Sequence, residues 1–430
     1  MPNRLASDSS QRRFAESIVR RIVEQHHIAY FAGGCVRDNL LGIEPSDYDI
    51  ATSATPEQVQ AIFGTNRTLF VGAAFGVVCV HQRIDSILHQ VEVATFRSDG
   101  DYSDGRRPDR VEFTTPEGDA QRRDFTINGL FYDPIAQQVI DFVEGVKDLD
   151  QCVLRAIGNA RARFSEDKLR LLRAVRIAAR FDFEIEPNTQ AAIIEMASQV
   201  QIVSPERIAA EMQKMLAHRS RAAAIELLFH FGLLLAVFPE LAQSLSDEST
   251  REKTLLRLKA IEQEDFIAAV AVLCYAFLES LSDSKYFEAC KRVVKELKLR
   301  WRLSNEDAAA VEFTIHNAPI FLTADQVHWS VLQPLLISPF VKHSLQFVRS
   351  LDVNEKVKTA ILLRCASALK LPNNELNPPF LVDGHMLMKA GLPTGPEYAR
   401  LIKLARAAQL DGVIRTHDEA LEWVRRHCRF

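Results

Sequence analysis

The pattern of apolar and polar positions changes once along this chain, near Leu154. Before that point, short apolar runs of strand length are separated by Gly, Asp and Pro. The runs lie at residues 28–34, 68–72, 75–82, 89–96 and 138–143. After that point, apolar residues recur every three or four positions almost without interruption, which is the period of amphipathic helices. The sequence therefore predicts an α+β part followed by an all-α part.

Proline and asparagine mark the expected breaks in the helical part. Pro187, Pro205 and Pro239 fall between helical stretches, and the run LPNNELNPPF at 371–380 has the composition of a linker. No fixed-period repeat is present, which argues against a solenoid. We therefore expect a leader with a first helix, an α+β domain and three helical segments. Their ranges are 1–28, 29–150, 151–222, 223–371 and 372–430.

Composition and charge narrow the class of protein. Of the 430 residues, 47% are hydrophobic and 25% are charged, which is typical of globular proteins and rules out a fibrous or wholly disordered chain. The net charge of -4 means that any nucleic-acid partner must be bound by a local basic patch. The longest apolar run, Phe266 to Leu278, has 13 residues. Because crossing a bilayer takes roughly 18 to 20, we expect a buried core helix and no membrane partner.

The cysteines and the N-terminus bear on the compartment. The 7 cysteines are scattered, and none are spaced as Cys-x-x-Cys, so the sequence predicts neither a disulfide framework nor a zinc site. A reducing cytoplasm fits this pattern best. The first 25 residues lack the apolar stretch of a secretory signal. They are rich in Arg and Ser like an organellar transit peptide, but Asp8, Glu16 and Glu24 count against that interpretation.

The segment FAGGCVRDNLLGIEPSDYDI, residues 31–50, holds the first candidate site. Asp47 and Asp49 are two positions apart, so in an extended strand both carboxylates point to one face, at a spacing that suits a hard cation such as Mg²⁺. Mg²⁺ keeps waters and substrate phosphates in its remaining positions, as in phosphoryl or nucleotidyl transfer. Gly33 and Gly34 allow close backbone approach, and the helix expected after them offers N–H donors to an anion such as a triphosphate.

An isolated Asp-x-Asp is more often a solvated turn, but here the context is more specific. A GG…RD…DxD run ahead of a second strand with a carboxylate resembles the polymerase-β nucleotidyltransferase superfamily. The resemblance places Gly33, Gly34 and Arg37 in a nucleotide-binding set. The second strand includes residues 90–94, where Glu92 stands between apolar neighbours. By resemblance Glu92 is the third acidic residue of the site; the alternative is a surface charge on an edge strand.

Three further motifs narrow the family. They are QRRDFTINGLFYDP at 121–134, DLDQCVLRAIGNARARFSEDKLRLLRAVRIAARF at 148–181 and VSPERIAAEMQKML at 203–216. In order and spacing they resemble the class II tRNA nucleotidyltransferase and bacterial poly(A) polymerase family, strongly over residues 29–222 and more weakly at 381–412. The resemblance implies an α+β nucleotidyltransferase head with a small mixed sheet and flanking helices, followed by an all-α neck, body and tail within the ranges given above.

In that family the Arg-Arg-Asp motif contacts the ribose and phosphates of the incoming nucleotide. The resemblance assigns this role to Arg123 and Asp124, with Arg122 beside them. A carboxylate that accepts from the ribose 2′-hydroxyl is a sound basis for selecting ribonucleotides. The alternative is a solvated helix start, although the apolar run that follows requires one side to face structure. Asn128 follows Asp124 by four positions and is expected on the same helix face, as a secondary nucleotide-binding candidate.

The family reads the nucleotide base with a Glu-Asp-x-x-Arg motif, which here is Glu166, Asp167 and Arg170. Cytosine and adenine both present an amino donor next to an unprotonated ring nitrogen, whereas uracil and guanine present the opposite polarity. An Asp acceptor and an Arg donor, expected on one helix face, would therefore accept C and A. With Ser165 as a plausible N-cap, the alternative is that the acidic pair only complements the helix dipole.

The same helix is expected to continue with a one-sided basic stripe. Arg173, Arg176 and Arg180 recur at intervals of three and four positions. This stripe could contact RNA phosphates, or it could be solvated or ion-paired with the preceding domain. Arg207 and Glu211 are spaced i to i+4 and are expected to form a helix-stabilising pair rather than a catalytic one.

Two features favour tRNA end repair within the family. The run VGAAFGVV at 71–78 resembles the GxxFGTV run of CCA-adding enzymes more than the basic version of poly(A) polymerases. The segment at 96–113 resembles the flexible loop of CCA-adding and A-adding members, and its Gly, Asp and Ser content suits a mobile element. Gly129 stands where Ala or Ser is common, which affects the subtype assignment and not the chemistry.

The resemblance therefore implies a template-independent, Mg²⁺-dependent enzyme that adds CCA to tRNA 3′ ends from CTP and ATP with release of pyrophosphate. The expected catalytic residues are Asp47, Asp49 and Glu92, with the metal on Asp47 and Asp49. The alternatives are a poly(A) polymerase, a partial CC- or A-adding enzyme, and, more distantly, an inactive RNA-binding module. The sequence gives no indication of oligomeric state.

Overall fold

The computed structural model describes residues 9–72, 76–84, 86–100, 111–389, 391 and 397–427. The Ala73–Phe75 part of the VGAAFGVV run, most of the expected loop at 96–113, the leader before residue 9 and Cys428 lie outside these residues. The chain forms two compact units, one of residues 1–211 with 227–237 and one of 212–226 with 238–430. The predicted cuts into head, neck, body and tail stay a prediction.

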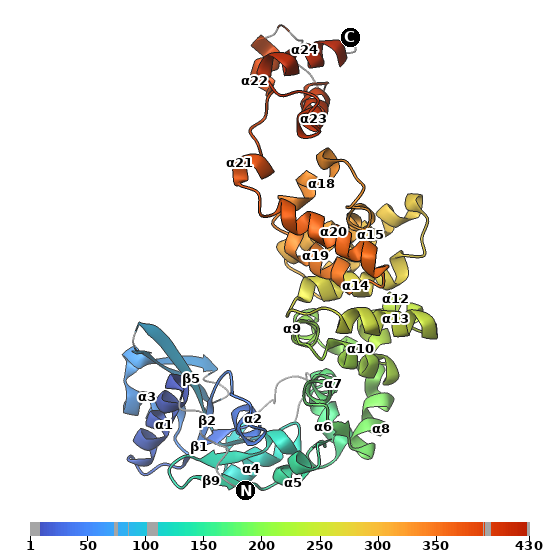
Figure 1. The fold of residues 1–430 in the computed structure, drawn as a ribbon. Coiled ribbons are helices and arrows are strands. Elements are labelled where there is room, and N and C mark those ends of the chain that lie inside the picture. The colour runs from blue at the N-terminus through green and yellow to red at the C-terminus, as the bar shows by residue number, and fades with distance from the viewer. Residues whose placement is uncertain are drawn as a thin grey trace. The chain divides into compact units, whose positions relative to one another are not determined.

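A seven-stranded mixed sheet forms the centre of the first unit, in the order β3-β4-β5-β2-β1-β8-β9 (Figure 1). Its strands are β1 (Ala29–Ala32), β2 (Asp49–Thr52), β3 (Thr68–Gly72), β4 (Val77–Ile84), β5 (Ile87–Thr95), β8 (Phe131–Asp133) and β9 (Gln138–Ile140). Only the β2–β5 pair is parallel among them. The prediction of a mixed sheet is therefore confirmed.

One face of this sheet is covered by helices α1 (Ser10–Val23) and α3 (Pro56–Phe63). Ile50 of β2 and Val91 and Val93 of β5 point into the apolar core on that side. Because side chains alternate along a strand, Asp49 and Glu92 point to the opposite face. The same alternation puts Ala51 there, against a second small core. The sheet thus separates its packed face from the face that carries the acidic residues.

The remaining elements of the first unit are short strands, helices and 3-10 turns. The strands are β6 (Arg97–Asp99), β7 (Val111–Phe113), β10 (Val153–Leu154) and β11 (Glu184–Ile185). The helices and 3-10 turns are α2 (Gly34–Leu40), η1 (Thr65–Arg67), α4 (Pro116–Gln121), η3 (Thr126–Asn128), α5 (Gly145–Asp150), α6 (Ala160–Glu166), α7 (Leu169–Phe181), α8 (Pro187–Met196), η4 (Ala197–Ile202) and α11 (Leu233–Val237). Two more helices, α9 (Pro205–Ala217) and α10 (Arg221–His230), contribute residues to both units.

The second unit is helical throughout its described residues. Its helices are α12 (Pro239–Ser244), α13 (Glu248–Lys259), α14 (Phe266–Leu278), α15 (Asp283–Arg300), α16 (Asn305–His316), α17 (Ala318–Phe321), α18 (Trp329–Leu336), α19 (Val341–Ser350), α20 (Glu355–Ala368), α21 (Asn373–Leu376), α22 (Gly384–Lys389), α23 (Glu397–Leu410) and α24 (His417–His427). The predicted buried core helix at Phe266–Leu278 is confirmed, because α12, α13, α15, α16 and α19 all pack around α14. Pro187, Pro205 and Pro239 each open a helix, where a missing N–H costs nothing.

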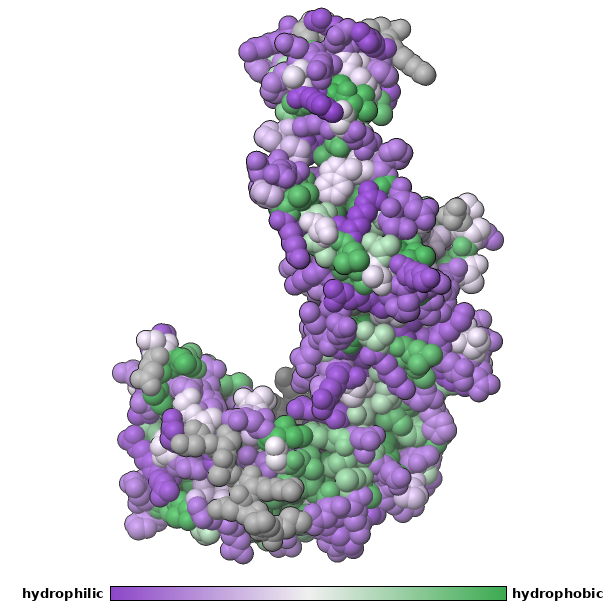
Figure 2. All heavy atoms as spheres, viewed as in Figure 1, coloured by the Kyte–Doolittle hydropathy of each residue, from purple (hydrophilic) through white to green (hydrophobic). Residues whose placement is uncertain are grey.

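Hydrophilic side chains cover most of the visible face of the second unit, with apolar ones in small patches (Figure 2). No helix within the described ranges combines the length and apolar character needed to cross a membrane. The apolar residues of α22, α23 and α24 instead form a small core of their own, which includes Leu387, Leu401 and Val424.

Gly145 allows α5 to pack closely against η3, the turn that ends at Asn128. A Cβ at this position would lie 2.2 Å from the carbonyl oxygen of Thr126, which is backbone and cannot move aside cheaply. We expect Gly145→Ala to lower the free energy of unfolding by about 2 kcal/mol, the usual cost of overpacking. Urea denaturation followed by circular dichroism measures the change.

Gly384→Ala is the matched control, because a Cβ there meets nothing closer than 3.9 Å. We expect this variant to change stability by less than about 0.5 kcal/mol. Equal stability of Gly145→Ala and the wild-type protein would contradict the close packing of α5 on η3.

Candidate active site

A cavity of about 480 Å³ in the first unit brings most of the predicted site residues together. Those that line it are Gly33, Gly34, Arg37, Asp47, Asp49, Arg122, Arg123, Asp124, Asn128, Asp167, Arg170, Arg173 and Arg176. Glu92, Glu166 and Arg180 do not line it. Arginines outnumber carboxylates in the lining, so the cavity suits a polyanion. Motifs from four separate stretches of the chain thus meet in one place.

The acidic pair lies where β2 begins. Asp49 is the first residue of the strand, Asp47 comes just before it, and both are exposed while Tyr48 between them is buried. Glu92 of β5 is the direct register partner of Asp49. β5 lies between β4 and β2, so the interpretation of Glu92 as an edge-strand charge is wrong.

The surroundings of Asp49 raise the pKa of its carboxyl group. Partial removal from water, followed by the charges of Asp47 and Glu92, raises the pKa of Asp49 to about 6, against the opposing effect of Arg123. A divalent cation would relieve that cost, and oxygen ligands are those Mg²⁺ prefers. Among the described residues, no three His, Cys, Asp or Glu side chains are grouped closely enough to form a complete site. The pair therefore fits an ion that takes its other ligands from water and substrate.

Gly33 has a backbone conformation that favours glycine, and a side chain at this position would not fit. Its φ is +74°, and a Cβ on it would lie 2.8 Å from Nη1 of Arg123. Its N–H donates to the carbonyl of Leu130 at 3.0 Å, which ties the turn to the neighbouring segment. Helix α2 begins directly after it, at Gly34. The group that approaches the backbone at this glycine is the Arg123 guanidinium, and close approach of a nucleotide stays a prediction.

The two arginines of the Arg-Arg-Asp motif share one carboxylate that sequence reasoning missed. Asp119 lies in α4, is 1% exposed and pairs with Arg122 at 2.7 Å and with Arg123 at 2.9 Å. Burial would raise the pKa of Asp119, but Arg123 and Arg122 hold it below its usual range. The spacing of three and four positions before the arginines was a usable signal, since such pairs meet on a helix.

Asp124 is the most fully engaged carboxylate of the cavity. Its Oδ1 accepts from the N–H of Phe125 at 2.8 Å and from the Asn128 amide at 2.9 Å, and its Oδ2 accepts from Nε of Arg173 at 2.8 Å. Burial would raise the pKa of Asp124, but Arg173 and the Asn128 hydrogen bond hold it well below its usual range. The expected contact with Asn128 is present, although a 3-10 turn makes it and not an α-helix.

Arg37 is buried and contacts Asn128 at the amide oxygen, whereas Asp124 contacts the amide nitrogen. Its Nη1 donates to Oδ1 of Asn128 at 2.5 Å, and its Nε donates to Asp38 at 2.8 Å. The guanidinium also lies over the ring of Phe181, 4.5 Å from the ring centre. Burial lowers the pKa of Arg37, against the opposing effect of Asp38. Arg37 and Asp124 thus hold Asn128 from both sides.

The base-reading motif does not lie on one helix face, which corrects the prediction. Helix α6 ends at Glu166, and α7 begins at Leu169. Asp167 lies at the break with extended backbone and accepts from the Leu169 N–H at 3.0 Å, so it caps α7. The expected N-cap, Ser165, is inside α6. Asp167 and Arg170 still line the same cavity, one from the break and one from the first turn of α7.

Each member of this motif has an ion-pair partner. Arg207 binds both carboxylate oxygens of Asp167, at 3.0 and 2.7 Å, and Arg170 pairs with Glu166 at 2.5 Å. Arg207 therefore does not form the predicted pair with Glu211. That prediction failed because Arg207 pairs with Asp167 at the break before α7, and Glu211 pairs with Arg176 of α7.

The basic stripe on α7 is ion-paired along its length. Arg173 pairs with Asp124 at 2.6 Å, Arg176 with Glu211 at 2.5 Å, and Arg180 with Asp38 at 3.9 Å. The contacts of Arg173 and Arg180 favour the interpretation of the stripe as salt bridges to the preceding domain, whereas Arg176 pairs with Glu211 of the later helix α9. Contact between the same arginines and RNA stays a prediction.

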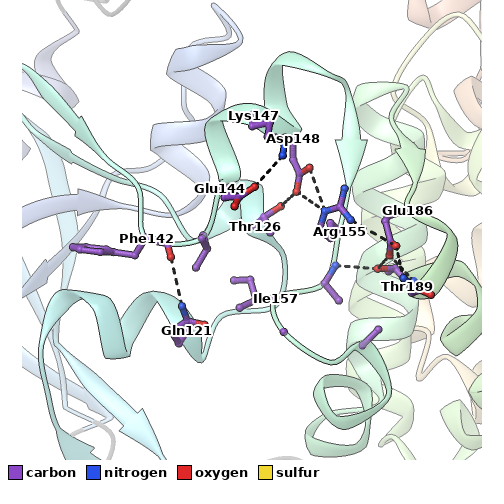
Figure 3. Close-up of a pocket in the computed structure, with 15 residues that line it drawn as sticks. Gln121, Thr126, Phe142, Glu144, Lys147, Asp148, Arg155, Ile157, Glu186 and Thr189 are labelled. Carbon is purple, nitrogen blue, oxygen red and sulfur yellow. Dashed lines mark hydrogen bonds and ion pairs between the residues drawn. The ribbon is translucent and has the colours of Figure 1, made fainter.

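A second cavity, of about 530 Å³, contains none of the predicted site residues (Figure 3). Asp148 lies between Thr126 at 2.7 Å and Arg155 at 3.0 Å, and Glu186 accepts from the N–H of Thr189 at 2.8 Å. Glu186 therefore caps the first turn of α8. The polar groups drawn in Figure 3 satisfy one another, which is the arrangement of a structural network.

Removal of the Asp124 charge tests the network around it. We expect Asp124→Asn to lower the free energy of unfolding at pH 7 by about 2 kcal/mol, because Arg173 loses a charged acceptor. The pKa of Asp124 is lower in the folded protein than in the unfolded chain, so its contribution is present above about pH 4 and is lost as the pH falls. The wild-type and variant stabilities should therefore converge in acid. Urea denaturation at pH 7 and at about pH 2.5, below the usual aspartate pKa, measures this.

Asp182→Asn is the control. Asp182 is exposed and lies at the end of α7, the helix that carries Arg173, in a left-handed conformation that Asn tolerates. It should leave stability nearly unchanged at both pH values. A difference between Asp124→Asn and the wild-type protein that is as large at about pH 2.5 as at pH 7 would contradict the charge argument.

Comparison with known proteins agrees with this geometry. Residues 29–155 match the Poly A polymerase head domain, and residues 182–245 match the probable RNA and SrmB-binding site of polymerase A. The chain is 32% identical to a CCA-adding enzyme of Anoxybacillus flavithermus over 423 residues, 96% of this chain and 97% of the relative. It is 30% identical to a CCA-adding enzyme of Lactobacillus gasseri over 417 residues, 94% of each chain. The CCA-adding enzyme of Bacillus stearothermophilus, solved in complex with CTP, has a TM-score of 0.76 at 27% identity and covers 97% of this chain and 98% of its own. The chain therefore belongs to the class II tRNA nucleotidyltransferase and bacterial poly(A) polymerase family, and it is a nucleotidyltransferase.

Proposed function

We propose that this enzyme adds CCA to the 3′ ends of tRNA from CTP and ATP, without a template and with release of pyrophosphate. The observation that carries the proposal is one cavity in which the acidic pair, the Arg-Arg-Asp motif and the base-reading motif all meet. Relatives matched over nearly their whole length are CCA-adding enzymes, which supports this specificity over polyadenylation. The proposed compartment is the cytoplasm, where tRNA repair takes place.

The acidic pair would bind Mg²⁺ through Asp47 and Asp49, with Glu92 as the third carboxylate beside them. The ion would activate the RNA 3′-hydroxyl as a nucleophile and offset the charge of the triphosphate. The hydroxyl oxygen forms a bond to the α-phosphorus, the bond to the bridging oxygen breaks, and pyrophosphate leaves. The carboxylates themselves hold the reacting groups in line, and no covalent enzyme intermediate forms.

The basic side of the cavity would bind the nucleotide. Arg122 and Arg123 donate to phosphate oxygens, and Gly33 leaves room for the Arg123 guanidinium to approach the backbone there. Asp124 has both oxygens engaged by Asn128 and Arg173, so its orientation is fixed before a ribose hydroxyl arrives. Binding then orders few groups in the protein, which favours affinity.

Base selection would rest on Asp167 and Arg170. Asp167 accepts from the exocyclic amino group of C or A, and Arg170 donates to the adjacent ring nitrogen. Arg207 grips the Asp167 carboxylate with two hydrogen bonds, and Glu166 holds Arg170. Their ion-pair partners keep Asp167 and Arg170 from rotating. U and G would therefore face an acceptor and a donor of the wrong polarity, which disfavours their binding.

The proposal is tested with tRNA transcripts that end at the discriminator base, at C or at CC. Purified enzyme receives Mg²⁺ with CTP, ATP or both, and the products are resolved to one nucleotide. We expect completion to CCA followed by arrest. Long A tails would assign a poly(A) polymerase, arrest at CC or addition of A alone would assign a partial enzyme, and no incorporation would favour the inactive RNA-binding module.

Variants of the acidic pair test the metal assignment in the same assay. We expect Asp47→Ala and Asp49→Ala to lose transfer while they keep the wild-type circular dichroism, because removal of clustered like charges does not destabilise the fold. The wild-type melting temperature should rise on addition of Mg²⁺, and that of both variants should not. Mg²⁺ stabilisation that persists in both variants would contradict the assignment.

Arg170→Ala tests the assignment of base selection. We expect the ratio of kcat/KM for CTP to that for UTP to fall by about tenfold or more, because the variant no longer donates to the ring nitrogen. Arg180→Ala is the control on the same helix, since Arg180 does not line the cavity. An unchanged CTP to UTP ratio in Arg170→Ala would contradict the role of Arg170.

A further inference from the structure

The carboxylate of Asp119 is buried among donors that belong to the nucleotide-binding motif. It lies in α4, below the cavity lining, and has 1% of its surface exposed. Asp119 does not itself line the cavity, so direct contact with a nucleotide is not its role. Its whole hydrogen-bonding capacity is directed at its protein neighbours.

Each oxygen of Asp119 serves one arginine. Oδ1 accepts from Nε of Arg122 at 2.8 Å and also from the Arg97 backbone N–H at 3.3 Å. Oδ2 accepts from Nε and Nη2 of Arg123 at 3.2 and 2.9 Å. A guanidinium that binds through two nitrogens to one anchor is fixed in its plane as well as in its position. The carboxylate therefore sets the direction of both arginines.

Arg123 is fixed by three further surfaces. Its Nη1 donates to the carbonyl of Asn128 at 3.4 Å, and its guanidinium lies over the ring of Phe131, 5.1 Å from the centre. On the remaining side it meets the backbone at Gly33. Without Asp119, the strongest of these contacts is lost, and the side chain can adopt other rotamers.

The charge of Asp119 is retained at neutral pH because Arg123 and Arg122 lower its pKa despite burial. The three groups together carry a net positive charge at the wall of the cavity. Two arginines without that carboxylate would carry more charge but would repel each other and lose their fixed direction. In a variant without the carboxylate, the loss of orientation would weaken phosphate binding, whereas the added positive charge would strengthen it. An experiment can therefore separate the two effects.

We propose that Asp119 is a positioning residue that holds Arg122 and Arg123 in the orientation that binds the polyphosphate of a nucleoside triphosphate. The inference rests on the proposed function, in which these arginines contact phosphate. It extends the nucleotide site to a residue that touches neither substrate nor metal.

The test compares Asp119→Asn with Asp148→Asn. Asp148 is matched in burial, at 2% exposed, and in partners, since it pairs with Arg155 and Thr126 in the same unit, but it belongs to the second cavity (Figure 3). Calorimetric titration with inorganic tripolyphosphate, in the presence of a chelator, isolates the arginine contacts from the metal and from base selection. Steady-state kinetics with CTP and ATP on the CC-ended and C-ended tRNA follow.

We expect Asp119→Asn to weaken tripolyphosphate binding by about tenfold, the usual effect of a lost charge-assisted hydrogen bond. KM for CTP and for ATP should rise together, with the choice between them unchanged. Asp148→Asn should keep the wild-type tripolyphosphate affinity and KM. A purely structural role for Asp119 would reduce the folded fraction, which lowers kcat and leaves KM and the affinity of the folded molecules as they were.

Wild-type affinity for tripolyphosphate in folded Asp119→Asn would overturn the inference, as would tighter binding, since added positive charge would then outweigh orientation. If Asp119→Asn does not fold, Asp119→Glu takes its place, because it keeps the charge but moves the carboxylate away from Arg122 and Arg123. It should weaken tripolyphosphate binding; wild-type affinity in folded Asp119→Glu would overturn the inference.

The titration separates this inference from the proposed function. If the wild-type enzyme fails to complete CCA but binds tripolyphosphate in an Asp119-dependent manner, the proposed function fails and the inference stands. If it completes CCA while Asp119→Asn keeps the wild-type affinity and KM, only the inference fails. Failure of the wild-type protein to bind tripolyphosphate overturns the inference by itself.

Discussion

The cavity of the first unit depends on ion pairs between arginines and carboxylates that are distant in sequence. Asp124 and Arg173 are 49 positions apart, and Asp167 and Arg207 are 40 apart. Each pair places a largely buried carboxylate beside an arginine, so removal of either partner would lower stability. The same ion pairs fix the orientation of the hydrogen-bond donors and acceptors that line the cavity. Stability and the preparation of the site for a nucleotide therefore have one physical source.

The sheet supplies the rigid frame on which these pairs are assembled. Its packed face is closed by α1 and α3, and strand alternation then leaves Asp49 and Glu92 on the other face. Partial removal from water, and after it the charges of Asp47 and Glu92, raise the pKa of Asp49. The arginines from the segments after the sheet come to that same face, so opposite charges meet across the space a polyphosphate would fill.

Short-range features of the site could be predicted from the sequence, and long-range ones could not. The acidic pair and Gly33 follow from local spacing, and Asn128 meets Asp124 four positions away as expected. Asp119 was within reach of the same spacing argument, but most such acids are solvated, so nothing distinguished it. The break at Asp167 has no Pro or Gly to mark it, and the run therefore resembled one continuous helix. The partners of Arg176 and Arg207 lie outside the helices that carry these arginines, so periodicity within one helix gives no information on them.

The pairing of Asp124 with Arg173 also sets how small an independent piece of this protein can be. A fragment that ends at the predicted boundary near residue 150 would contain the whole sheet and the acidic pair. It would nevertheless lose Arg173, the countercharge of Asp124, together with α7. The cavity is therefore incomplete within residues 1–150, and a fragment meant to preserve it would have to extend through α7 to Arg207.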